Sequence, residues 1–182
     1  MAHVSWPVRE QPRDLAFVAR GEECEEARTV EHAFTRCGFS GDEWLALQDS
    51  PLRAFLWVAT ADGPVRPRER EACRRVLDEG LSSPSPLVGY ICGESLRQLD
   101  VLGPERLSES PDLELLHPLV ARVAERLGLG EASRFQRYLL DVGWRVARAS
   151  NGLLGLVGQV RGEERLALEA LAETLGLQDL GG

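Results

Sequence analysis

Apolar residues recur at intervals of three and four along most of this chain, and this spacing constrains the fold more than any other feature. The clearest stretch, residues 131–150, carries a stripe made of Phe135, Leu139, Val142, Val146 and Ala149. These residues fall on one face of a helix, because one helical turn takes 3.6 residues. An alternating apolar and polar pattern, which would indicate a strand, reaches no useful length. The sequence therefore predicts an all-α protein.

Start and stop signals divide this pattern into separate helices. Ser40 and Glu43 have the spacing of a capping box and predict a short helix around Trp44. Ser50-Pro51 and Ser110-Pro111 each place a serine N-cap before a proline, which is typical of a helix start. The other expected helices cover residues 21–38, 67–80, 87–99, 131–150 and 162–175, the last with an apolar set of Leu166, Ala167, Ala170, Leu171 and Leu175. We expect a compact bundle of about seven helices.

Length, charge and missing motifs narrow the class of protein. The 182 residues fit one domain with a substantial core, and a net charge of -8, with arginines mixed among acids, argues against a nucleic-acid partner. No run approaches the ~18 apolar residues of a membrane span, and the first residues lack a secretory signal, so we expect a cytoplasmic protein. Cys24, Cys37, Cys73 and Cys92 match no zinc spacing and should be reduced. No catalytic or nucleotide-binding motif is present, and we expect no enzymatic activity.

The turn before Pro67 carries the first candidate site. Asp62-Gly63 forms this turn, and Glu69 lies in the first turn of the helix that follows. Two interpretations stay open. The two carboxylates could bind a small cation that prefers oxygen ligands. Alternatively, Asp-Gly is a common connector between helices, and the helix dipole favours a glutamate in a first turn.

A later segment resembles this one. Val65-Arg66-Pro67-Arg68-Glu69 matches Val160-Arg161-Gly162-Glu163-Glu164 in position, and an Asp-Gly or Asn-Gly pair comes before each. Internal similarity of this kind predicts two helical units related by a pseudo-twofold axis, which would bring their turns to related positions. The matched polar set, and the predicted metal site, is Asp62, Glu69, Asn151 and Glu164.

Both motifs resemble those of the tellurite-resistance TerB-like family. ATADGPVRPRERE is similar to the family's ADG-x-V-x-x-x-E signature, and ASNGLLGLVGQVRGEERLALEALAETLGL is similar to its later repeat. The resemblance divides the chain into an N-terminal arm with an extra helix (residues 1–45) and a TerB-like helical domain (residues 46–182). It implies an internal repeat, a bacterial stress-response context, and an acidic metal site formed by Asp62, Glu69 and Glu164. Asn151 departs from the family pattern, where an aspartate is expected, and this removes one negative charge from a hard-cation site.

The glycine-rich segment after Asn151 supplies a second candidate site. Its apolar residues are Leu153, Leu154, Leu156 and Val157. Because exposed apolar loops are costly, these side chains either tuck into the core or contact a partner. We expect an interaction or sensing module that binds a divalent cation such as Ca²⁺ and an unidentified protein partner. The alternative is a metal-free structural or oligomerisation module that uses residues 153–157 as its contact surface.

Overall fold

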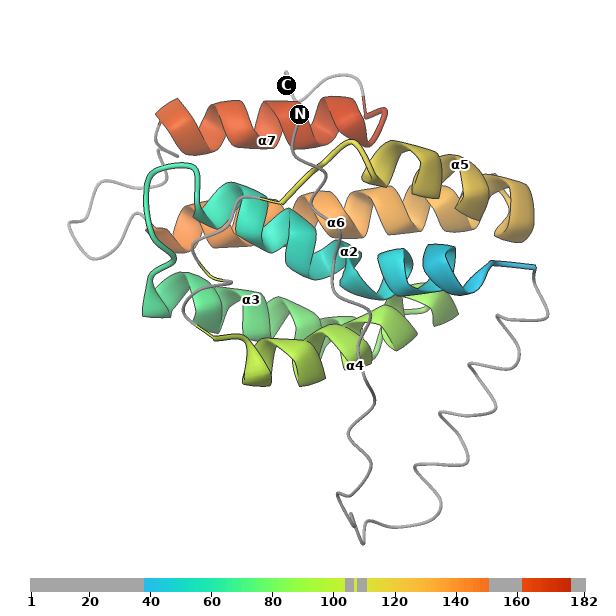
Figure 1. The fold of residues 1–182 in the computed structure, drawn as a ribbon, viewed down its shortest axis with the longest axis horizontal. Coiled ribbons are helices and arrows are strands. Elements are labelled where there is room, and N and C mark those ends of the chain that lie inside the picture. The colour runs from blue at the N-terminus through green and yellow to red at the C-terminus, as the bar shows by residue number, and fades with distance from the viewer. Residues whose placement is uncertain (1–37, 104–106, 108–110, 151–161, 178–182) are drawn as a thin grey trace, which may run out of the picture.

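The computed structural model describes residues 38–103, 107, 111–150 and 162–177, which form six helices and no strand (Figure 1). The helices are α2 (Gly41–Ala59), α3 (Pro67–Gly80), α4 (Pro86–Val101), α5 (Leu116–Leu127), α6 (Leu129–Ser150) and α7 (Gly162–Thr174). The all-α prediction is confirmed for these residues, with six helices where about seven were expected. The helix expected over residues 21–38 lies almost wholly outside the described residues. Helix α2 runs across the expected boundary at residues 45 and 46, and the domain division stays a prediction.

Helices α2 and α6 run side by side through the middle of the bundle, and α6 contacts each of the other five described helices. In Figure 1, α5 and α7 lie on one side of this pair, and α3 and α4 lie on the other. Gly143 of α6 allows a close approach, since a Cβ there would lie 3.0 Å from Leu168 Cδ2 and 3.2 Å from Val58 Cγ2. Val58 belongs to α2 and Leu168 to α7, so this glycine lets α6 pack closely against both helices.

The predicted helix start at Ser50-Pro51 is wrong, because α2 continues through both residues. A proline inside a helix removes the N–H that would bond the carbonyl four residues earlier. Here that carbonyl belongs to Leu47, and the Ser50 hydroxyl donates to it at 2.7 Å. Both Ser50 and Leu47 are fully buried. The serine therefore satisfies the acceptor that the proline leaves without a backbone donor, and the two predicted helices become one.

Replacing Ser50 with Ala should destabilise the protein by about 1–3 kcal/mol, since the buried Leu47 carbonyl loses its side-chain donor. Chemical denaturation measures this loss. The matched control is the same substitution in a Pro51→Ala background, where the restored backbone N–H can bond Leu47. There the cost of Ser50→Ala should shrink markedly, as a double-mutant cycle would report. Equal costs in both backgrounds would contradict this account of the tolerated proline.

The start predicted at Ser110-Pro111 is also wrong, since α5 begins at Leu116. Before it, Asp112 Oδ1 accepts the Glu114 N–H at 2.8 Å and forms a turn in place of a first helical turn. Pro118 lies in the first turn of α5, where a proline leaves no backbone hydrogen bond unmade. A helix that began at Pro111 would carry Pro118 in its interior, so the later start avoids a broken hydrogen bond.

The remaining sequence expectations concern the cysteines and the membrane. Cys73 and Cys92 are buried free thiols, as predicted, and Cys24 and Cys37 lie outside the described residues. Burial raises the pKa of Cys92 to about 11, although a hydrogen bond with Tyr138 opposes the rise. In the part of the chain that the structure describes, every helix is too short or too polar to cross a membrane.

Candidate cation site

The chain turns sharply after α2 and positions the first carboxylate. The Thr60 N–H and hydroxyl both donate to the Leu56 carbonyl, at 3.0 and 2.7 Å, and end the helix. Gly63 follows with a φ of 136°, in a region that favours glycine, and its N–H donates to the Thr60 carbonyl at 3.3 Å. Asp62 lies within this turn, and its side chain is only 4% exposed. The connector thus holds a nearly buried carboxylate just before α3.

Glu69 is the third residue of α3 and caps the start of that helix. Its Oε2 accepts the Arg66 backbone N–H at 2.7 Å, which satisfies a donor that a helix start would otherwise leave unpaired. Pro67, at the first helical position, has no N–H to satisfy. Sequence reasoning assigned Glu69 only a favourable interaction with the helix dipole, and this hydrogen bond adds a capping role. The same carboxylate keeps its second oxygen, Oε1, for another partner.

Arg66 links the two carboxylates. Its Nη2 lies 2.8 Å from Asp62 Oδ2, and its Nη1 lies 3.1 Å from Glu69 Oε1. The Arg66 side chain is 29% exposed, whereas that of Glu69 is 1% exposed. The hydrogen bond to Asp62 raises the pKa of Arg66, so the guanidinium keeps its charge. One cationic group therefore reaches from the surface to two largely buried anions.

Glu164 comes to the same place from the other end of the chain. It is the third residue of α7 and is 1% exposed, and α7 packs against both α2 and α6. One oxygen from each of Asp62, Glu69 and Glu164 can be chosen so that all three lie within 4.8 Å of one another. Carboxylates at this separation repel each other unless a cation lies among or beside them. The cluster is thus a place where positive charge is favoured.

The electrostatics of Glu69 show the cost of this arrangement. Burial raises the pKa of the Glu69 carboxyl, and the neighbouring Asp62 adds to the rise, while the Arg66 backbone and guanidinium oppose it. The raised pKa means that the folded state holds this proton more tightly than the unfolded chain does. As the pH rises through the folded-state pKa and Glu69 ionises, the free energy of unfolding therefore falls. A cation bound at Glu69 would compete with this proton.

The structure brings together three of the four predicted metal ligands. Asp62, Glu69 and Glu164 form the cluster, whereas Asn151 lies outside the described residues. The predicted partner-binding residues also lie outside them: Leu153, Leu154, Leu156 and Val157. Arg66 contacts two of these three carboxylates directly. Its two ion pairs depend on the side-chain conformation, which spacing along the sequence does not encode.

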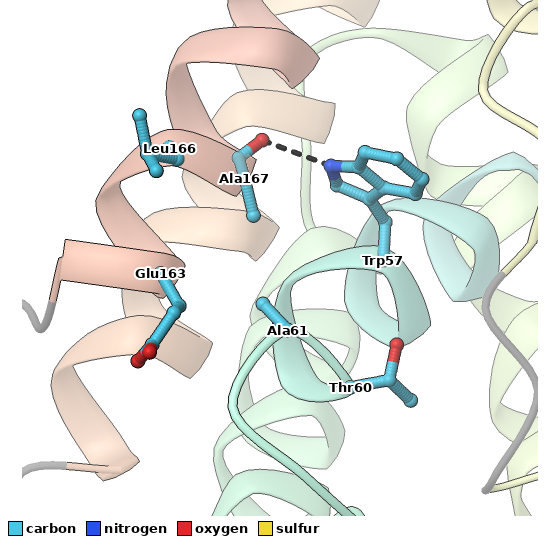
Figure 2. A pocket seen from close by; sticks show the side chains of 6 residues that line it. All are labelled: Trp57, Thr60, Ala61, Glu163, Leu166 and Ala167. Atoms are coloured by element: carbon cyan, nitrogen blue, oxygen red, sulfur yellow. Dashed lines mark hydrogen bonds between the residues drawn. The ribbon is translucent and has the colours of Figure 1, made fainter.

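Sequence reasoning missed a shallow pocket between the end of α2 and the start of α7 (Figure 2). Leu166, which was expected in the core, lines this pocket and is 66% exposed. The buried face of α7 instead uses Ala167, Leu168, Leu171 and Ala172. The sequence of α7 has apolar residues on more than one face of the helix. Periodicity alone therefore does not indicate whether Leu166 or Leu168 faces the solvent. The pocket residues are Trp57, Thr60, Ala61, Glu163, Leu166 and Ala167.

Known proteins offer no guide to this site. Comparisons with protein-family models, with curated proteins and with solved structures find no match for this chain. The TerB-like resemblance therefore rests on its two short motifs. The second of them lies partly in residues 151–161, outside the described residues, and the internal repeat stays a prediction.

Proposed function

We propose that this chain is a TerB-like module, with two related helical repeats, that binds a divalent cation such as Ca²⁺ and presents a surface to a partner protein. The observation that carries the proposal is the convergence of Asp62, Glu69 and Glu164, two of them 1% exposed, from opposite ends of the described chain. The motif resemblance supports the family and, with it, a cytoplasmic role in bacterial stress response. The module acts by binding and carries out no catalysis of its own.

The chemistry of the cluster supports a hard cation. Ca²⁺ prefers carboxylate oxygens and takes six to eight ligands, so water or backbone carbonyls would complete its shell around three carboxylates. The three acids span the Asp62 turn, the start of α3 and the start of α7. An ion there would link segments that the sequence separates widely.

Arg66 gives the site two states. Without the ion, its guanidinium pairs with Asp62 and Glu69. Because the side chain is 29% exposed and long, it can move into solvent without unfolding α3, since the Arg66 backbone N–H still donates to the capping Glu69 carboxylate. We infer that the ion and the guanidinium compete for the same carboxylates. The capped turn would persist in both states.

The proposal is tested by calcium calorimetry on the full-length protein. Wild type should bind one ion with a Kd on the order of 10 µM to 1 mM, the range of weaker calcium sites. Asp62→Asn should raise the Kd at least about tenfold, because one carboxylate charge is lost. Asp78→Asn removes the same charge from an exposed position of α3 and is the matched control. Equal affinities in the two variants would place the ion elsewhere, and no heat of binding in wild type would refute the proposal.

A further inference from the structure

The pocket missed by sequence reasoning is a second place where this module can make contacts. It lies between the carboxyl end of α2 and the start of α7, with a volume of about 260 Å³ (Figure 2). This volume can hold a large apolar side chain. Ala61 and Glu163, which line it, directly precede Asp62 and Glu164 of the cation site. The pocket is therefore adjacent to the cluster but formed by different residues.

The walls of the pocket are largely apolar and firmly held. The Trp57 indole N–H donates to the Ala167 carbonyl at 3.0 Å, which fixes the ring of α2 against the backbone of α7 (Figure 2). Leu166 forms another part of the wall and exposes 66% of its surface. An exposed leucine on the wall of a pocket favours contact with another apolar group over contact with water.

The charge at the rim narrows the kind of occupant. Glu163 lines the pocket and is exposed, and no other described residue forms an ion pair with it. The chain as a whole carries a net charge of -8. An apolar side chain that enters between Trp57 and Leu166 would place its neighbours in sequence close to Glu163. A basic neighbour is attracted there, and an acidic one is repelled.

We propose that this pocket docks a basic apolar segment of a partner protein, in which a Leu or Phe fills the space and an adjacent Arg or Lys pairs with Glu163. The docking proposal states the chemistry of the partner protein that the proposed function requires. It rests on the proposed function only where it predicts an effect of calcium. The apolar contact and the ion pair with Glu163 need no metal. Calcium, if bound, would act by holding Asp62 and Glu164, and with them the two pocket walls.

The test titrates a short synthetic peptide containing Leu-Arg-Phe-Arg into the full-length protein and monitors binding by NMR. The peptide should shift the Trp57 indole N–H and the Leu166 methyl resonances, whereas matched peptides containing Leu-Glu-Phe-Glu or Ser-Arg-Ser-Arg should not. Glu163→Gln should weaken binding by about two- to fivefold, the usual range for a surface ion pair. Glu173→Gln, an exposed position near the other end of α7, should leave the affinity unchanged.

Several results would overturn the docking proposal. The proposal is wrong if the peptide binds without shifting the Trp57 and Leu166 resonances. It is also wrong if the basic and acidic peptides bind with equal affinity. Concentration-dependent shifts of the same resonances without peptide would assign the pocket to a second copy of the chain. Binding that appears only in a Leu154→Asp, Leu156→Asp variant would assign it to the chain's own apolar segment. Each titration is run in EDTA and in calcium. If the protein binds no calcium, the titration in EDTA still tests whether the peptide docks in the pocket.

Discussion

Replacing Arg66 with Gln is expected to tighten calcium binding by about tenfold, equivalent to ~1.4 kcal/mol. The guanidinium pairs with Asp62 and Glu69, and an ion must displace it before using those oxygens. Opposite charges about 4 Å apart near a protein surface attract with ~4 kcal/mol, so even partial removal of this competitor favours the ion. The Arg66 backbone N–H still caps α3 through Glu69 after the substitution. Calcium calorimetry on the variant measures the change.

The matched control for this prediction is Arg68→Gln. Arg68 is exposed two residues away, and its loss changes the net charge by the same amount. Its effect on calcium affinity should be small, because salt screens exposed charges. In the absence of calcium, Arg66→Gln should also destabilise the fold more than Arg68→Gln does, since two largely buried carboxylates lose their partner. Weaker calcium binding in Arg66→Gln would show that Arg66 supports the site instead of competing for it.

Replacing Gly80 with Ala is expected to destabilise the protein by about 3 kcal/mol, at the upper end for overpacked cores. A Cβ at Gly80 would overlap with Cys92 Sγ and lie 2.7 Å from Tyr138 Oη. Neither atom is free to move aside. The Cys92 thiol donates to Tyr138 Oη at 2.9 Å, and the tyrosine hydroxyl donates to the Val76 carbonyl at 3.1 Å. This network joins α3, α4 and α6, so an added methyl group would force all three apart.

Chemical denaturation of Gly80→Ala measures this loss, with Gly93→Ala as the control. Gly93 lies inside α4, and a Cβ there would meet its nearest neighbour at 3.7 Å, an ordinary contact. Alanine should therefore stabilise that helix by about 0.5–1 kcal/mol through its higher helix propensity. Opposite signs for the two substitutions are expected. A mild effect at Gly80 would mean that the thiol and the tyrosine repack easily.

Local signals predicted local structure well in this chain. The Ser40–Glu43 capping box is present, with the Ser40 N–H donating to Glu43 at 2.8 Å and the Glu43 N–H donating to Ser40 at 3.2 Å. The start at Pro67 was also correct. The start at Ser50-Pro51 was wrong. A serine before a proline can cap a helix, but it can also donate to the carbonyl that the proline leaves without a backbone donor. A sequence motif does not distinguish these two uses.

The candidate site was predictable only in part. Matching the two motifs grouped Asp62 and Glu69 with Glu164, and one oxygen of each lies within 4.8 Å of the others. The pairing of Arg66 with two acids depends on a side-chain rotamer, and the outward placement of Leu166 depends on how α7 rotates against α2 and α6. Both are set by tertiary packing, which the local pattern does not contain.

The most direct test of the central claim is thermal unfolding in EDTA and in saturating calcium, for wild type and for Glu164→Gln. This substitution keeps the size of the side chain and leaves the ion pairs of Arg66 with Asp62 and Glu69 in place. A site that binds the ion only when folded predicts stabilisation of wild type by about 2.7 kcal/mol at a hundredfold excess over Kd, and a much smaller shift in the variant. An equal calcium shift in both proteins, or none in wild type, would contradict a cation site shared by α3 and α7.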